Sequence, residues 1–565
     1  MKSQLLSMLV VIAAFSLPAR TSRHDQQLHA RQSVAFPHEA TALVANDGIR
    51  VSQDVERRIV QRVGLRRLDL GARESHLVRQ FNLEFPAIQG EGITVVIFGP
   101  GRVRETHVEF RLHQSEPHSS RVLVKTKKAL DRYSTYLAGV IGAQGRNAEA
   151  KGMAPLIKLI SEDLDNHLVK LRALAPYVQI ATHYQFKKAG WDKDSKRREW
   201  FWWGDPRISQ EVDSSFGKYG NQEAEIDDII YSNRHLLLFA PAGNDRNDGP
   251  EKQPIRHRAR NPNTNTITWI SSDRVRNVDG ANKGGLDTII GLGLAKNVVC
   301  VGSIDDVTLS NPITSEDYSG WGPADDGRIK PDLVANGYRV LSSSSASDIA
   351  YHEDTGSSTA SAAAAGIGGL LMELLQKERP HLMGYAAAVI KASLIHTATD
   401  DRRLKGPDAR FGWGSINALK AGQTISMKKE GKFCHFIDVA EVGKVESTKR
   451  KHYEFESMGG PVRATLVWID PPGSPNSLGL DDATPALQND LDIRLINPNG
   501  QVSYPYRLDR SNPLSQAKRD GPNRVDNVEV VDASAAPGKW EVEVVAANLK
   551  KGLSQRFALV VSGLK

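Results

Sequence analysis

Cysteine is nearly absent from the chain. Its 565 residues contain only Cys300 and Cys434, so a disulfide framework is excluded and a large hydrophobic core must hold the fold together. Cys300 lies in the apolar run 297–301, which predicts a buried strand in which cysteine behaves as a small hydrophobic residue. A bond between the two cysteines stays open, because the sequence does not show whether their Cβ atoms meet.

Long hydrophobic runs are also lacking. After the N-terminal segment no stretch approaches the roughly 20 apolar residues that a membrane span needs. Residues 1–19 combine Lys2, an apolar run and the small Ala19, which is the pattern of a secretory signal peptide. We expect cleavage near Ala19, export to the extracellular space or periplasm, and no stable membrane span; an N-terminal anchor is the alternative. The polar, arginine-punctuated residues 20–66 are predicted to be a leader or linker.

The composition is that of an ordinary globular protein. Hydrophobic residues make up 40% and charged residues 25%, and the length suffices for two or three domains. The formal net charge is +7. Because lysine and arginine are scattered and no known nucleic-acid motif accompanies them, we expect a solvated basic surface and no nucleic-acid partner.

The order of predicted elements indicates the fold class. Near-continuous β-rich runs are typical of central parallel strands, and they occur at 93–98, 157–160, 178–182, 235–240 and 298–302. Helical patterns lie between several of them, so residues 67–421 are predicted to form an α/β doubly wound domain. After Ala421, short alternating runs separated by turn signals predict an all-β sandwich over 422–565.

Two short segments contain residue types that could take part in catalysis. In Gly356-Ser357-Ser358-Thr359-Ala360-Ser361, Ser358 falls at the start of a small-residue helix, where unpaired N–H groups and positive potential suit a nucleophilic hydroxyl. The alternative is a serine that only caps a buried helix. The second segment, Ala242-Gly243-Asn244, follows an apolar strand. Its amide side chain is of the kind that donates a hydrogen bond to a developing oxyanion.

Together these segments resemble the subtilisin-like serine proteases, the subtilases of peptidase family S8. Residues 356–360 are similar to the family's Gly-Thr-Ser-Met-Ala box, with Ser358 at the nucleophile position, and 242–244 to its Ala-Gly-Asn oxyanion segment, with Asn244 as the donor. Residues 318–323 and 326–332 match its Phe-Ser-Ser-Arg-Gly-Pro and Gly-Arg-Ile-Lys-Pro-Asp stretches. The resemblance spans most of residues 68–565 and implies a subtilisin-like doubly wound, mostly parallel sheet.

The C-terminal part resembles a subgroup that carries a jelly-roll-like β domain. The strings at 466–473 and 489–493 carry this likeness. Members of the subgroup often bind calcium, which the resemblance makes a candidate ligand, although no cofactor is required for the chemistry. Oxygen-bearing candidates are Asp490, Asp492, Asp526 and Glu529, and exposed turn carboxylates are the favoured interpretation.

The resemblance breaks at the other two triad positions. Alignment through residues 90–92 puts Gly99 where the family has its aspartate; a slip of one residue would put Phe98 there. The family's His-Gly-Thr-His-Val-Ala-Gly corresponds to residues 133–139, so Tyr133 replaces the histidine. An ordinary tyrosine has a pKa of about 10. Its phenol is protonated at neutral pH and cannot readily take the serine proton.

Candidate substitute bases are Glu105, His107 and Glu109, which follow the altered strand, and His183, which lies near the counterpart of the family's substrate-binding strand. Structural roles are favoured for all four. The substrate-binding set implied by the resemblance has two parts. One is Ala242 and Gly243 beside the oxyanion donor. The other is the counterpart of the family's Asn-Ser-Trp-Gly strand, which here contains Tyr184, Gln185 and Phe186. The phenylalanine adds bulk where a peptide backbone would pair with the edge strand.

The sequence therefore favours a secreted, monomeric pseudoprotease that binds a peptide or protein ligand. One alternative is an active or atypical serine-type endopeptidase in which another base serves Ser358. A second alternative is a surface-binding protein that acts through its β domain.

Overall fold

The computed structural model describes residues 71–564 apart from short internal gaps, which are 113–118, 185–187, 195–198, 262, 265, 272–275, 307–312, 401–404, 428–433 and 477–478. The predicted signal peptide and leader lie outside the described residues, as do Gln185 and Phe186. Residues 69–565 group into one compact unit, and the description that follows concerns this unit.

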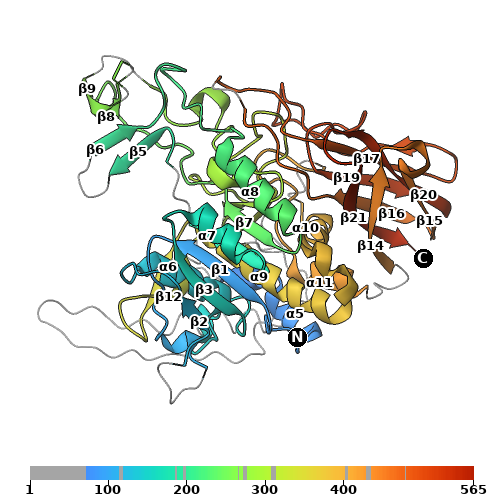
Figure 1. The fold of residues 1–565 in the computed structure, drawn as a ribbon, viewed down its shortest axis with the longest axis horizontal. Coiled ribbons are helices and arrows are strands. Elements are labelled where there is room, and N and C mark those ends of the chain that lie inside the picture. The colour runs from blue at the N-terminus through green and yellow to red at the C-terminus, as the bar shows by residue number, and fades with distance from the viewer. Residues whose placement is uncertain are drawn as a thin grey trace, which may run out of the picture. The chain divides into compact units, whose positions relative to one another are not determined.

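A seven-stranded sheet forms the centre of the α/β part (Figure 1). Its order is β11-β10-β7-β4-β1-β3-β2, and every neighbouring pair is parallel. The strands are β1 Thr94–Gly99, β2 Val122–Val124, β3 Lys158–Asp163, β4 Ile180–His183, β7 Leu237–Pro241, β10 Val299–Ile304 and β11 Leu333–Asn336. The five runs expected from the sequence are confirmed as β1, β3, β4, β7 and β10, while the short β2 and β11 were not foreseen. The doubly wound fold class is therefore correct.

Helices cover this sheet. They are α4 Gly71–Ser75, α5 Val78–Glu84, α6 Arg132–Gly142, α7 His167–Leu174, α8 Asn221–Ser232, α9 Ser357–Glu378, α10 Ala386–Thr397 and α11 Ala418–Ser426. Helix α9 contacts β4, β7, β10 and β11, and α6 contacts α9 and β1. By length and composition α9 could cross a membrane, yet its apolar window is wholly buried, as in the core helix of a globular domain.

Two segments, one after β4 and one after β7, together form a separate four-stranded sheet. Its strands are β5 Trp191–Asp194, β6 Glu199–Trp202, β8 Arg256–Arg260 and β9 Ile267–Ser271. In Figure 1 these strands lie apart from the seven-stranded sheet. Trp191, Trp202 and Ala259 form a small core of their own, so two tryptophans pack this sheet internally.

Two four-stranded antiparallel sheets make up the C-terminal region. One has the order β14-β21-β16-β19 and the other β15-β20-β17-β18. Their strands are β14 Cys434–Gly443, β15 Arg450–Ser457, β16 Gly460–Val467, β17 Asn489–Ile496, β18 Val502–Ser503, β19 Val528–Ala535, β20 Gly538–Leu549 and β21 Ser554–Leu564. Trp468, Leu491, Trp540 and Phe557 belong to the core of these sheets, as predicted for a sandwich.

The two regions share buried surface. Helix α10 contacts β16 and β21, and Val467, Val530 and Val560 belong to the same hydrophobic cluster as the α/β core. Cys300 is a free, fully buried thiol on β10, so it forms no disulfide. The division of the chain at Ala421 stays a prediction.

Candidate active site

Ser358 lies in the first turn of α9, which begins at Ser357. Ser358 is 1% exposed, and its neighbours Ser357 and Thr359 are fully buried. The first turn of a helix offers N–H groups and positive potential to a nucleophile. Here, however, the segment that carries the serine is covered by other residues.

On the oxyanion side of the site, side-chain oxygens accept hydrogen bonds from backbone N–H groups. Strand β7 ends at Pro241 and leads directly into Ala242, Gly243 and Asn244. Oδ1 of Asn244 accepts the N–H of Ser357 at 2.9 Å, and Oγ of Ser357 accepts the N–H of Gly243 at 3.2 Å. The Asn244 amide nitrogen lies 3.4 Å from the place that a Cβ on Gly356 would occupy. Because its oxygen is already engaged, the amide presents its N–H groups toward the turn before Ser358, as an oxyanion donor requires.

At the aspartate position there is no room for a side chain. Gly99 ends β1, and a Cβ on it would lie 2.3 Å from Oγ of Ser134. That hydroxyl donates to Oδ1 of Asp131 at 2.8 Å and accepts the N–H of Gly101 at 3.2 Å. Ser134 stands where the family's His-Gly-Thr-His stretch has its glycine. The Ser134 hydroxyl therefore fills the space that a side chain at position 99 would need, so the two positions are packed against each other.

Phe98, the neighbouring position if the alignment slips, offers no acceptor either. Its ring stacks on that of His183, with 4.5 Å between centroids.

Tyr133 lies beside the nucleophile turn. Its phenol oxygen is 3.1 Å from the position of a Cβ on Gly356, and its ring meets that of Tyr184 edge-on at 5.0 Å. Burial raises the pKa of Tyr133 above its usual value; the Thr359 hydroxyl acts in the opposite direction, and the Asp354 charge raises the pKa further. The phenol is therefore protonated at neutral pH and is a donor, not a base.

His107 and Glu109 have structural roles. Nε2–H of His107 donates to the Ala350 carbonyl at 2.8 Å, and Nδ1 accepts the Glu109 N–H at 3.2 Å. The Glu109 carboxylate accepts three backbone N–H groups and the Tyr351 hydroxyl. These contacts occupy both residues away from Ser358.

Two other candidate bases are placed elsewhere. Glu105 lies 4.0 Å from Arg102 in an ion pair. His183 ends β4 and is buried, and this burial lowers its pKa well below the usual value. A neutral imidazole between Phe98 and the edge of His167 is part of the core packing.

A histidine–carboxylate pair on the strand that precedes α9 was not anticipated from the sequence. Nε2 of His352 lies 3.3 Å from Oδ2 of Asp354, and both side chains are partly exposed. They lie on β13 Tyr351–Asp354, which leads through Thr355 into Gly356. The only signal in the sequence is their spacing of two residues, which places both side chains on one face of a strand.

A group of carboxylates follows the oxyanion segment. Burial, together with the Asp248 charge, raises the pKa of Asp245 to about 8, and burial with the Asp192 charge raises that of Asp248 to about 7. Burial also raises the pKa of Asp279 well above its usual value, and Asp213 adds to this shift. This end of the site is therefore acidic. Asp245 and Asp248 closely follow Asn244 in the sequence, but this spacing did not form a motif that predicted an acidic group.

The residues considered for calcium do not form one group. Nη1 of Arg524 lies 2.6 Å from Oδ2 of Asp490 and 3.1 Å from Oδ1 of Asp492. Glu529 accepts the Ile493 N–H at 2.8 Å, whereas Asp526 accepts the Ile329 N–H at 2.9 Å. One guanidinium thus partly offsets the charge of the first pair. Asp492, Asp526 and Glu529 are buried, so the expectation of exposed turn carboxylates is wrong for these three, and calcium at these residues stays a prediction.

Comparison with known proteins identifies the family. Residues 124–414, slightly more than half of the chain, match the Subtilase family. A Dictyostelium discoideum protein described as serine protease/ABC transporter B family protein tagA is 27% identical over 266 residues, which cover 41% of this chain. The match spans only 14% of that relative's own length.

Solved structures of proteases are also similar. The Clostridium perfringens CspB protease matches with a TM-score of 0.44 and 14% identity over 63% of this chain and 97% of its own. The prenylagaramide maturation protease PagA matches with a TM-score of 0.38 and 16% identity over 62% of this chain and 98% of its own. Since the family match covers more than half of the sequence, including the oxyanion and nucleophile segments, the chain belongs to the subtilase family.

Proposed function

We propose that this chain is a subtilase homologue that no longer hydrolyses peptide bonds and acts by binding a peptide or protein. The observation that carries the proposal is that a protonated Tyr133 lies beside Gly356, at the position that the sequence resemblance assigns to the catalytic histidine. Ser134 also fills the space that an acid at position 99 would need to orient a histidine there.

The energetics agree with this proposal. Loss of the catalytic histidine alone costs a subtilisin about 10⁶ in turnover, and the oxyanion hole with substrate binding leaves only about 10³ to 10⁴ over water. Asn244 keeps its anchored position, so a carbonyl oxygen can still be held. A site of this kind favours capture of a peptide over its cleavage.

The ligand class follows from the charges beside Asn244. The Asp248 charge adds to the burial that raises the pKa of Asp245, and the charges of both add to the burial that raises the pKa of Asp279, so any of them that ionises attracts a cation. We expect peptides with lysine or arginine to bind better than acidic ones. Export through the N-terminal segment is part of the proposal and would expose the protein to extracellular peptides.

Two measurements on the purified chain test the proposal. A fluorophosphonate probe should leave Ser358 unmodified under conditions that label an active subtilase completely. Labelled peptides of matched length, one rich in lysine and one in glutamate, should differ in fluorescence anisotropy in favour of the basic peptide. Rapid labelling that disappears in Ser358→Ala would overturn the inactive assignment, and equal binding of both peptides would overturn the ligand class.

The atypical endopeptidase is the second candidate, and the His352–Asp354 pair favours it. An imidazole already held by a carboxylate has the orientation that a general base needs, and the pair lies on the segment that leads into α9. Any peptidase activity that requires Ser358 should then fall at least about 10²-fold in His352→Ala. Activity that survives this change excludes His352 as the base.

A further inference from the structure

Three carboxylates from separate loops meet at a place remote in sequence from the nucleophile segment. They are Asp287, Asp325 in the loop between β10 and β11, and Asp481 in the loop between β16 and β17. One oxygen from each lies within 4.8 Å of the others. Asp287 and Asp325 are buried, with 8% and 7% of their surface exposed. The cluster therefore joins the α/β region to the C-terminal sheets.

Gly217 makes this meeting possible. A Cβ on it would lie 2.1 Å from Oδ1 of Asp325 and 2.3 Å from Oδ1 of Asp287. Its φ of +71° is also one that favours glycine. Two carboxylate oxygens from different loops thus occupy the space beside one bare Cα atom.

The cluster contains more carboxylates than positively charged groups. Nζ of Lys283 lies 2.7 Å from Oδ2 of Asp287 and 2.6 Å from Oδ2 of Asp481. Oδ1 of Asp287 has no hydrogen-bond partner among the described residues, although more than nine-tenths of the side chain is buried, and Oδ1 of Asp481 has none there either. One ammonium thus faces three carboxylates. A buried carboxylate oxygen without a partner is costly unless a cation compensates it.

From this geometry we infer a divalent-cation site, with Ca²⁺ as the ion, formed by the carboxylates of Asp287, Asp325 and Asp481. Hard oxygen ligands without nitrogen or sulfur suit Ca²⁺ and Mg²⁺, and ligands drawn from three loops suit the more flexible coordination of Ca²⁺. Water completes the coordination shell. The ion joins the β16–β17 loop to the α/β region and so stabilises their association.

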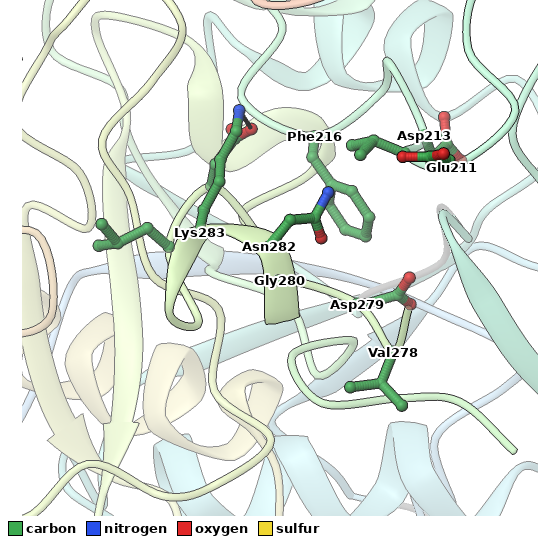
Figure 2. A pocket seen from close by; sticks show the side chains of 11 residues that line it. Glu211, Asp213, Phe216, Val278, Asp279, Gly280, Asn282 and Lys283 are labelled. Carbon is green, nitrogen blue, oxygen red and sulfur yellow. Dashed lines mark hydrogen bonds and ion pairs between the residues drawn. The ribbon is translucent and has the colours of Figure 1, made fainter. Parts of the chain in front are cut away.

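Lys283 is the competitor for this ion. Its side chain is 36% exposed, so its ammonium can move into solvent when the metal binds. In the view of Figure 2, Lys283 lies on one side of a solvent-connected hollow, and Glu211 and Asp213 lie on the other. The hollow gives an ion and its water ligands a route to Asp287, which also lines it.

Titration of Ca²⁺ into the EDTA-treated full-length chain tests the site by calorimetry and thermal unfolding. We expect binding with a dissociation constant below about 1 mM and, at saturation, a rise of about 3 °C in the unfolding midpoint. Asp325→Asn should abolish both effects. Asp490→Asn separates this site from the other candidate calcium residues, among which Asp490 lies 2.6 Å from Arg524, and it should leave the response intact.

A second variant keeps the test decisive if Asp325→Asn does not fold. Lys283→Met removes the competing ammonium, so Ca²⁺ should bind about tenfold more tightly than to the unaltered chain. Unchanged or weaker binding by Lys283→Met overturns the site. So does a calcium response that is lost in Asp490→Asn but kept in Asp325→Asn, and so does the absence of any response in the unaltered chain.

Discussion

The two sides of the candidate active site differ in how closely they resemble the subtilase motifs. On one side, the end of β7 and the start of α9 keep Asn244, Ser357 and Ser358 with the hydrogen bonds that fix the amide. On the other side, the end of β1 and the start of α6 carry Gly99, Tyr133 and Ser134, at the positions that the sequence resemblance pairs with the family's aspartate, histidine and glycine.

This difference shows that the side with Gly99, Tyr133 and Ser134, called the altered side below, does not simply lack catalytic side chains. Its residues also pack against one another. Loss of an aspartate alone would leave a cavity and a histidine without an orienting partner. Instead, the Ser134 hydroxyl fills the space, held by Asp131 and the Gly101 N–H. Substitutions that fit one another in this way predict that single reversions fail, because each meets the packing set by the others.

Full restoration of the altered side should have the largest effect. Gly99→Asp combined with Tyr133→His and Ser134→Gly supplies an acid, a base and the room for both. We expect fluorophosphonate labelling of Ser358 and peptide hydrolysis at least about 10²-fold above the unaltered chain, which is the lower range for general-base catalysis. Tyr133→His alone should stay at background, because no acid orients the imidazole.

The triple variant with Ser358→Ala added is the control, and it should neither label nor hydrolyse. If Tyr133→His alone gains as much activity as the triple variant, the packing of Ser134 against position 99 is irrelevant to catalysis. If the folded triple variant gains nothing, the oxyanion side is not competent, and the contrast between the two sides disappears.

A double-mutant cycle isolates the packing of Ser134 against position 99. Gly99→Ala places a methyl group 2.3 Å from Oγ of Ser134, so it should lower the free energy of unfolding by about 1–3 kcal/mol, as overpacking does. In the Ser134→Gly background the obstructing hydroxyl is gone. The penalty should then shrink, with a coupling energy of about 1 kcal/mol or more from urea denaturation.

Gly521→Ala is the matched control for the cycle, since a Cβ there meets nothing within 4 Å and should change stability little. Additive effects of Gly99→Ala and Ser134→Gly would show that the two positions are independent. The interpretation that they pack against each other would then be wrong.

The sequence allowed the sheet to be predicted because its strands are buried on both faces and read as apolar runs. Short strands such as β2, whose Leu123 is exposed, gave no such signal. The motif positions of Ser358, Asn244 and Tyr133 were local and could be aligned. The role of Ser134, the His352–Asp354 pair and the Asp287, Asp325 and Asp481 cluster could not be predicted, because each depends on contacts that only the folded chain creates.

A smaller effect is expected from the acidic group on the conserved side of the site. The pKa of Asp245 is raised to about 8, chiefly by burial and then by the charge of Asp248, with Asp192 and Asp213 adding to it. The folded chain therefore binds a proton more tightly than the unfolded chain, whose aspartate has a pKa of about 3.9. Between these two values stability falls as the pH rises, and the full penalty is present above pH 8.

Asp245→Asn removes this ionisation while keeping the shape of the side chain. We expect the unfolding midpoint to rise by about 2 °C at pH 8.5 and to change little at pH 4.5, measured by differential scanning fluorimetry. Asp509→Asn is the control of opposite sign, because the Lys518 hydrogen bond lowers the pKa of Asp509 to about 2; its loss should not stabilise at either pH. A gain for Asp245→Asn that is equal at both pH values would show that this carboxyl titrates normally. The oxyanion side would then lack the acidic character that favours basic peptides.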